Sequence, residues 1–143
     1  MTPFRMGNRS KTPAITVDAV VESGGKVLLI KRRNDPFKDH WALPGGFIEY
    51  GESAEDAIKR EVLEEANLEI EITGLLGVYS NPDRDPRGHV ISICFEAQGS
   101  GGERGGDDAM DARFFELKDA LKEDLAFDHR RILEDYSRSR NVL

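Results

Sequence analysis

The chain has 143 residues, of which 33% are charged and 38% are hydrophobic, and its formal net charge is −7. This length is typical of one domain with a core of its own, and the acidic balance argues against nonspecific binding to nucleic acid or to an anionic membrane. We find no run of about 18 apolar residues that would predict a membrane span.

The first 13 residues predict a flexible arm, because Pro3, Gly7 and Pro13 discourage regular structure. The arm is basic but has no apolar stretch after its charges, so it does not resemble a secretory signal. The single cysteine, Cys94, lies in an apolar run and is expected to be a buried, inert thiol. We therefore expect a cytoplasmic protein with one domain over residues 14–143.

The rest of the chain alternates β-branched or apolar runs with glycine-rich turns and contains two longer helical segments. In chain order we expect strands at 14–22 and 27–33, a loop and irregular chain to 52, a helix at 53–66, strands at 68–80, 89–98 and 111–117, a helical turn at 118–124 and a helix at 127–138. Ser53 is a good N-cap for the central helix, with Asp56 three residues later. The order predicts a mixed α/β domain with a largely non-parallel sheet.

Three acidic residues of the central helix, Glu61, Glu64 and Glu65, fall within an arc of about 100° on the helical wheel. At these spacings the acids repel one another, and they stand in the last turns, where the helix dipole disfavours negative charge. A divalent cation would reverse both effects, because carboxylate oxygens are natural ligands of a hard ion. The helix alone leaves two interpretations open, a metal site and a solvated acidic patch.

The flanking residues favour the metal site. From Gly46 to Leu68 the chain reads G-x5-E-x7-R-E-V-x-E-E-x-N-L. This segment, called the box below, resembles the signature of the Nudix hydrolases, G-x5-E-x7-R-E-U-x-E-E-x-G-U, where U is an aliphatic residue. Asn67 stands in place of the family's glycine, and the departure is mild because a left-handed backbone is wanted there and Asn tolerates it next best after Gly.

The resemblance implies a Nudix-type α/β/α sandwich with a mixed, largely antiparallel sheet, covering about residues 14 to 139. Glu52 and Arg60 would pair to hold the loop of the box against its helix, since a guanidinium matches a carboxylate in bidentate fashion. The implied ligands of Mg²⁺, or of Mn²⁺, are three carboxylates and one backbone carbonyl: Glu61, Glu64, Glu65, and Gly45 or Gly46.

The family's reaction is hydrolysis of a nucleoside diphosphate linked to another group, so the implied partner is a small nucleotide, and the implied assembly is a homodimer. Bound metal would neutralise the diphosphate and lower the pKa of a bound water. The catalytic base stays open between a box glutamate and an acid of the glycine-rich loop, whose acids could also serve only solubility; Glu103 is a weaker candidate. The catalytic candidates are Glu61, Glu64, Arg60, Glu52, Asp107 and Asp108.

Residues 34–52, 79–97 and 125–133 resemble the ADP-ribose pyrophosphatase branch, which implies cleavage of ADP-ribose into AMP and ribose 5-phosphate. The candidate substrate-binding residues are cations and an aromatic side chain near the box: Arg32, Arg33, Phe37, Arg84 and Arg87. Trp41 could stack on adenine or anchor the core. Tyr79 and Phe127 are expected in the core, and His89 and His129 as hydrogen-bonded structural residues.

Other activities remain open at this point. One is hydrolysis of oxidised nucleoside triphosphates or of another sugar nucleotide. A second, from a different class, is an ADP-ribose-binding sensor without catalysis. The sensor would regulate transcription and would need a DNA-binding domain, for which few residues remain after the last predicted helix. The complete set of box carboxylates favours catalysis.

Overall fold

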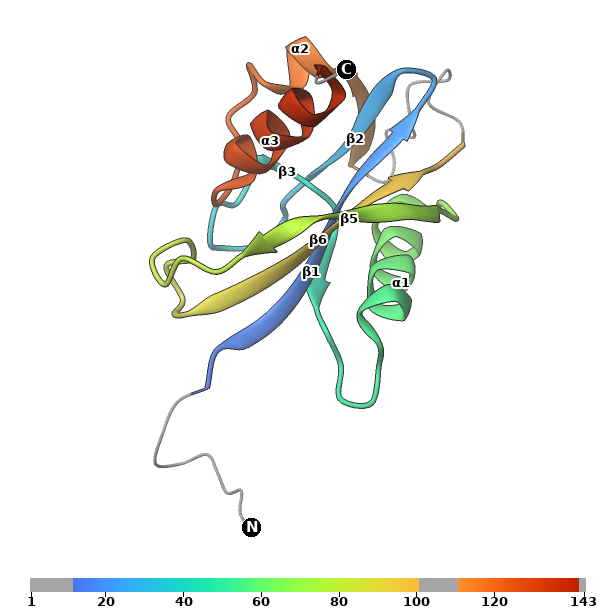
Figure 1. Ribbon diagram of the computed structural model, residues 1–143. Coiled ribbons are helices and arrows are strands. Elements are labelled where there is room, and N and C mark those ends of the chain that lie inside the picture. Colours follow the sequence, from blue (N-terminus) through green and yellow to red (C-terminus); the bar gives the residue numbers. More distant parts are fainter. Residues whose placement is uncertain (1–11, 101–110, 142–143) are drawn as a thin grey trace.

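The computed structural model describes residues 12–100 and 111–141. Over these ranges the chain forms seven strands and three helices, shown in Figure 1. The strands are β1 (Ala14–Ser23), β2 (Lys26–Lys31), β3 (Trp41–Ala42), β4 (Gly45–Phe47), β5 (Glu71–Tyr79), β6 (Val90–Gln98) and β7 (Ala112–Glu116). The helices are α1 (Ala54–Ala66), α2 (Leu117–Ala120) and α3 (His129–Asn141).

The strands form one mixed sheet in the order β3-β2-β1-β6-β5, with β4 paired to β1 and β7 paired to β2. Strands β1 and β6 run parallel, from Ala14 opposite Val90 to Glu22 opposite Gln98. The other pairings are antiparallel. The predicted mixed, largely antiparallel sheet is therefore confirmed.

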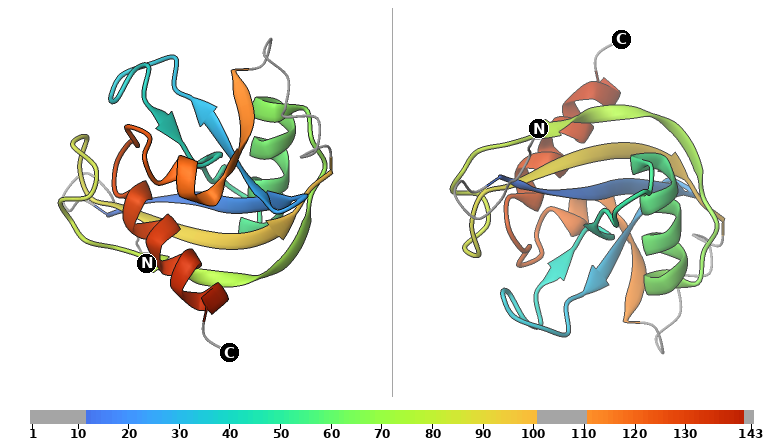
Figure 2. Two further views of the ribbon diagram at one scale, coloured as in Figure 1. Left: turned by 90° about the horizontal axis from the view of Figure 1, so that it is seen from above. Right: turned by 90° about the horizontal axis from the view of Figure 1, so that it is seen from below.

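Helices cover both faces of the sheet, with α1 on one face and α2 and α3 on the other (Figures 1 and 2). Alternate side chains of a strand point to opposite faces, so Val17, Ala19 and Val21 of β1 join the core beneath α1. Val20 joins a second core, which α3 closes with Ile132 and Leu133. Burial of both faces gives the predicted α/β/α sandwich.

The predicted elements agree with the structure where the hydrophobic pattern is long, as in β1, β6 and α1. The prediction of irregular chain before α1 was wrong, because β3 and β4 lie there. Strands of two and three residues are too short to show periodicity, and their pairing with β2 and β1 depends on the tertiary fold. The predicted arm lies outside the described residues except for Thr12 and Pro13.

Cys94 is buried within the second core, as predicted, and burial raises the pKa of its thiol well above the ordinary value. Along the two described stretches of chain, no helix is long and apolar enough to cross a membrane.

Candidate active site

Both ends of α1 are fixed by the residues that the sequence indicated. The Ser53 hydroxyl accepts a hydrogen bond from the backbone N–H of Asp56 at 3.0 Å. Asn67 follows the last turn with φ 54° and ψ 43°, a left-handed conformation, and its N–H donates to the carbonyl of Leu63. The left-handed backbone that the sequence predicts at Asn67 is therefore confirmed.

Glu52 and Arg60 form the predicted bidentate pair. Arg60 Nε lies 2.7 Å from Glu52 Oε2, and Arg60 Nη2 lies 3.0 Å from Glu52 Oε1. Arg60 Nη2 also donates to the Phe47 carbonyl at 3.2 Å, so the pair ties β4 to α1. The hydrogen bond from Arg60 lowers the pKa of the Glu52 carboxyl to about 2.

The three acids of the box lie in different surroundings. Glu61 accepts a hydrogen bond from Arg60 at 3.0 Å and Glu65 accepts one from the Gly45 N–H at 3.0 Å, while the Glu64 side chain is largely exposed. Burial, then the negative charge of Glu61, raises the pKa of Glu65 to about 8. Burial also raises the pKa of Glu61.

Strand β4 itself lies directly against two of these acids, Glu61 and Glu65. A Cβ atom at Gly46 would meet Glu61 Oε2 at 2.4 Å, so glycine is the residue that permits this approach. Within the described residues, no three His, Cys, Asp or Glu side chains lie close enough to hold a metal ion as they stand. The donor set nevertheless fits a hard divalent cation, because Glu61 and Glu65 are partly buried acids that repel each other's charge. Metal binding by these residues stays a prediction.

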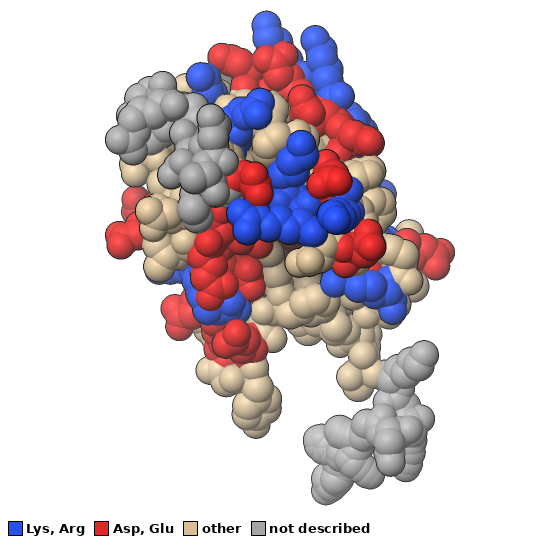
Figure 3. All heavy atoms as spheres, turned by 180° about the vertical axis from the view of Figure 1, so that it is seen from behind, with Lys and Arg blue, Asp and Glu red and all other residues tan. Residues whose placement is uncertain are grey.

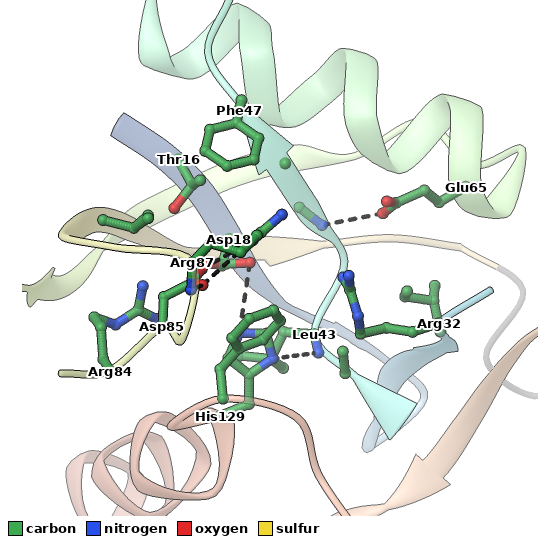
Figure 4. Close-up of a pocket in the computed structure, with 16 residues that line it drawn as sticks. Thr16, Asp18, Arg32, Leu43, Phe47, Glu65, Arg84, Asp85, Arg87 and His129 are labelled. Atoms are coloured by element: carbon green, nitrogen blue, oxygen red, sulfur yellow. Dashed lines mark hydrogen bonds and ion pairs between the residues drawn. The ribbon is translucent and has the colours of Figure 1, made fainter. Parts of the chain in front are cut away.

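A cavity of about 210 Å³ opens beside the box (Figure 4). Its walls come from β1, β4, α1, the loop before β6 and the start of α3. The polar and aromatic lining residues are Thr16, Asp18, Arg32, Phe47, Glu65, Arg84, Asp85, Arg87, Phe127 and His129.

A second cavity of about 420 Å³ adjoins the first and shares Ile30, Arg32 and Glu65 with it. Its other lining residues include Arg33 and Glu64. Cations and carboxylates thus face each other here. Figure 3 shows the same character at the surface, where Lys and Arg side chains gather next to a run of Asp and Glu on one face of the molecule.

Arg32 and Arg87 are the predicted substrate-binding residues that the structure brings together. The Arg32 guanidinium lies 5.0 Å from the ring of Phe127, and the Arg87 guanidinium lies 5.6 Å from the same ring and 5.0 Å from that of Phe47. Burial, then the positive charge of Arg87, lowers the pKa of Arg32. Arg87 is held by Asp85 at 2.8 Å. Two guanidinium groups beside one ring indicate a place for an anion.

Arg84 and Arg33 have carboxylate partners as well. Arg84 is nearly buried and makes two hydrogen bonds with Asp128, at 2.9 and 2.6 Å. It lines the first cavity but holds the loop 81–88 to the start of α3. Arg33 is largely exposed and pairs with Asp111 at 2.9 Å at the edge of the second cavity.

The aromatic candidates beside the box belong to the core. Phe37 packs edge-on against Phe127 at 4.8 Å and is not among the residues that line either cavity. Trp41 packs against Phe115 at 5.1 Å, which supports the core alternative. Phe127, expected only in the core, also lines the first cavity. The predicted acids Asp107 and Asp108, and the weaker candidate Glu103, lie outside the described residues.

Sequence reasoning missed Asp18 as a site residue. Asp18 lies in the middle of β1 and is 7% exposed, and burial raises the pKa of its carboxyl to about 7. Ser92 Oγ donates to Asp18 Oδ2 at 2.5 Å. The available signal was an acid in the strand sequence AITVDAVVE, at a position that shares a sheet face with Val20.

His129 is buried and lines the first cavity. Its Nδ1 accepts a hydrogen bond from the Leu43 N–H at 3.0 Å, and burial lowers the pKa of the imidazole to about 3. His89 Nε2 lies 3.1 Å from the Ser80 carbonyl. The predicted hydrogen-bonded roles of both histidines are confirmed.

Comparison with known proteins supports the resemblance to the Nudix hydrolases. A model of the NUDIX domain matches residues 12–136. The chain is 55% identical over 130 residues to the ADP-ribose pyrophosphatase of Methanocaldococcus jannaschii, covering 90% of this chain and 76% of that protein. It is 31% identical to the ADPR responsive transcriptional repressor NtrR of Acinetobacter baylyi, covering 86% of this chain but only 52% of the repressor.

A solved structure agrees with these sequence relationships. The NUDIX domain of Shewanella oneidensis NrtR complexed with ADP ribose superposes with a TM-score of 0.79 at 33% identity, covering 95% of this chain and 93% of that one. The match over most of the chain, together with the box and its paired Glu52 and Arg60, places this chain in the Nudix family.

Proposed function

We propose that this Nudix hydrolase cleaves ADP-ribose into AMP and ribose 5-phosphate. The observation that carries the proposal is the boundary between the two cavities, where Arg32 and Glu65 line both. A diphosphate lying across this boundary would meet the box acids and the guanidinium groups together. The substrate class follows the 55% identity to the archaeal ADP-ribose pyrophosphatase.

The two cavities suit the two halves of such a substrate. A volume of about 210 Å³ is smaller than the pockets that enclose whole drug-sized ligands, so the first cavity accommodates one half. The rings of Phe47 and Phe127 provide apolar faces for the adenine base. The second cavity is bordered by Lys31, Arg32 and Arg33, which suits the ribose phosphate half.

The reaction adds water across the diphosphate. One oxygen–phosphorus bond to the bridging oxygen breaks, a new one forms to the water oxygen, and the two products leave as monophosphates. When bound, Mg²⁺, or Mn²⁺ in its place, neutralises the diphosphate and lowers the pKa of water. We propose Glu61, Glu64 and Glu65, with a carbonyl of Gly45 or Gly46, as its ligands.

The other side chains of the site position the substrate and the loop. Arg32 and Arg87 offset the charge of the diphosphate, while the Glu52–Arg60 pair holds β4 against α1. Glu61 or Glu64 of the box, or Asp107 or Asp108, which lie outside the described residues, supplies the base in this proposal. A box acid freed from its hydrogen bond would accept the proton of the attacking water.

A substrate panel tests this function. Purified protein is incubated with Mg²⁺ and ADP-ribose, other sugar nucleotides or oxidised nucleoside triphosphates, and the products are identified by chromatography. AMP with ribose 5-phosphate supports the proposal. Inorganic pyrophosphate from a triphosphate would instead support the sanitising activity, and ADP-ribose binding without any product would support a sensor.

We also propose a cytoplasmic homodimer that does not bind nucleic acid. Strand β5 ends the sheet order, and its Leu75 and Val78 are exposed, which suits burial against a second copy. The net charge of −7 disfavours a nucleic-acid partner. Light scattering at twice the mass of the chain supports the dimer, and the monomer mass at all concentrations would contradict it.

A further inference from the structure

Asp18 is a buried carboxylate in the first cavity whose surroundings leave one oxygen available. Ser92 donates to Oδ2 at 2.5 Å. The other oxygen, Oδ1, lies 3.8 Å from His129 Nε2, too far for a hydrogen bond. Arg84 is the cation whose charge acts on Asp18, but it makes no hydrogen bond there, because its guanidinium is hydrogen-bonded to Asp128.

Strand β4 packs closely against Asp18, which still lines the first cavity. Gly45 of β4 stands opposite Asp18, and a Cβ atom there would approach Oδ1 to 2.3 Å. Figure 4 shows Asp18 at the centre of the cavity, between Phe47 and His129. Burying 93% of an acidic residue costs free energy, and the hydrogen bond from Ser92 offsets only part of that cost. A hydrogen-bond donor on the ligand would offset more of it.

The donor that Asp18 meets is not a phosphate group. Phosphate oxygens carry negative charge and would be repelled by a carboxylate, whereas Arg32 and Arg87 attract them at another wall of the same cavity. The rings of Phe47 and Phe127 favour a flat base. An edge of such a base that reached Oδ1 would need an N–H to pair with it.

We propose that Asp18 is a specificity-determining residue, which selects adenine by accepting a hydrogen bond from its exocyclic amine at Oδ1. This deepens the proposed function, because it names how the adenine half of the substrate is recognised. Hypoxanthine carries a carbonyl oxygen in place of that amine, so its oxygen would face the carboxylate and two acceptors would be left unpaired. Sites built on such a hydrogen bond discriminate strongly against analogues that lack the donor.

Binding of AMP and IMP tests this proposal independently of hydrolysis. Isothermal titration at pH 8.5 gives both dissociation constants for the wild type. We expect AMP to bind about tenfold or more tightly than IMP. In Asp18→Asn the amide can turn its NH₂ toward the cavity and donate to the carbonyl of hypoxanthine, so the preference for AMP should fall to about one or reverse.

Asp135→Asn is the matched control, because Asp135 also accepts a hydrogen bond from a hydroxyl, that of Tyr79 at 2.8 Å, but lies outside the first cavity. Its AMP preference should equal that of the wild type. Urea unfolding establishes whether each variant is folded, and if Asp18→Asn is not, the wild-type ratio decides. Equal binding of AMP and IMP by the wild type, or an unchanged preference in a folded Asp18→Asn, would overturn the proposal.

A ribose hydroxyl is the other donor that a nucleotide offers, and a second comparison separates it from the amine. If Asp18 bound the ribose, Asp18→Asn would weaken AMP and IMP equally and would leave a deoxyribose analogue unaffected, which would contradict base selection. A wild type that prefers AMP but leaves ADP-ribose uncleaved would refute the proposed function while leaving the role of Asp18 intact.

Discussion

At the scale of single residues, Glu65 is the acid of the box whose surroundings are least favourable to a negative charge. It is partly buried, it lies near the like charge of Glu61, and its pKa rises to about 8. A cation bound there would remove this penalty. Substitution of Glu65 is therefore the most direct test of the proposed metal ligands.

Glu65→Gln should weaken binding of Mn²⁺, measured by calorimetry or electron paramagnetic resonance, by about tenfold or more, because changes at metal sites typically cost this much. Glu69→Gln is the control, since Glu69 is exposed and lies beyond the box. Equal Mn²⁺ affinity in both variants would show that Glu65 is not a ligand.

His129 makes a prediction about pH. Its pKa is about 3 in the folded protein because of burial, against about 6.5 in the unfolded chain. Between these values the unfolded chain binds more protons, so this residue makes stability fall as the pH falls from about 6.5 to about 3. Asp18, with its raised pKa, acts in the opposite sense over about pH 4 to 7, so only a comparison with a variant isolates the histidine.

In His129→Asn the amide oxygen can still accept from the Leu43 N–H, but the side chain cannot titrate. The advantage of the wild type over this variant, measured by urea unfolding, should be smaller at pH 5 than at pH 7.5, by at most about 1.4 kcal/mol per pH unit below 6.5. A constant difference across that range would contradict a neutral buried imidazole.

At the scale of elements, the ends of α1 depend on local contacts, whereas the attachment of the loop 81–88 depends on a contact between distant residues. The helix ends are set by Ser53 and Asn67, which the sequence indicates directly. The loop is attached by a buried pair, Arg84 with Asp128, which joins residues 44 positions apart. Their proximity could not be predicted, because no local pattern connects a turn to a distant helix start.

Asn67→Gly should raise the free energy of unfolding by up to about 1 kcal/mol and leave the hydrolysis rate unchanged, because glycine adopts the left-handed conformation at lower cost. Asn67→Ala should lower stability. Denaturant unfolding and steady-state rates measure both effects. A large change of rate in Asn67→Gly would mean that the side chain acts in the site.

Asp128→Asn should lower the free energy of unfolding by about 2 to 4 kcal/mol, because it leaves the nearly buried Arg84 without its partner. Asp111→Asn breaks an ion pair with Arg33 that is mostly exposed, so it should cost less than about 1 kcal/mol. Urea unfolding of both variants makes the comparison. Equal costs would show that the buried pair does not hold the loop.

At the scale of the whole molecule, the sandwich places the end of β4, the last turns of α1 and the start of α3 around one cavity. The box, the Glu52–Arg60 pair and the strand content followed from the sequence, because each depends on neighbours or on a spaced motif. Three features depend on contacts between segments that are distant in the sequence. They are the short strands β3 and β4, the position of Asp18 and the exposure of Phe127 to the first cavity. Such contacts exist only once the chain has folded.

The most direct test of the central claim is identification of the products formed from ADP-ribose in Mg²⁺ by the wild type and by Glu65→Gln. The wild type should yield AMP and ribose 5-phosphate in equal amounts, and the variant should form them about a hundredfold more slowly or worse, as expected for loss of a metal ligand. An intact ADP-ribose after prolonged incubation with folded wild-type protein, or equal rates in the two proteins, would contradict hydrolysis at the box.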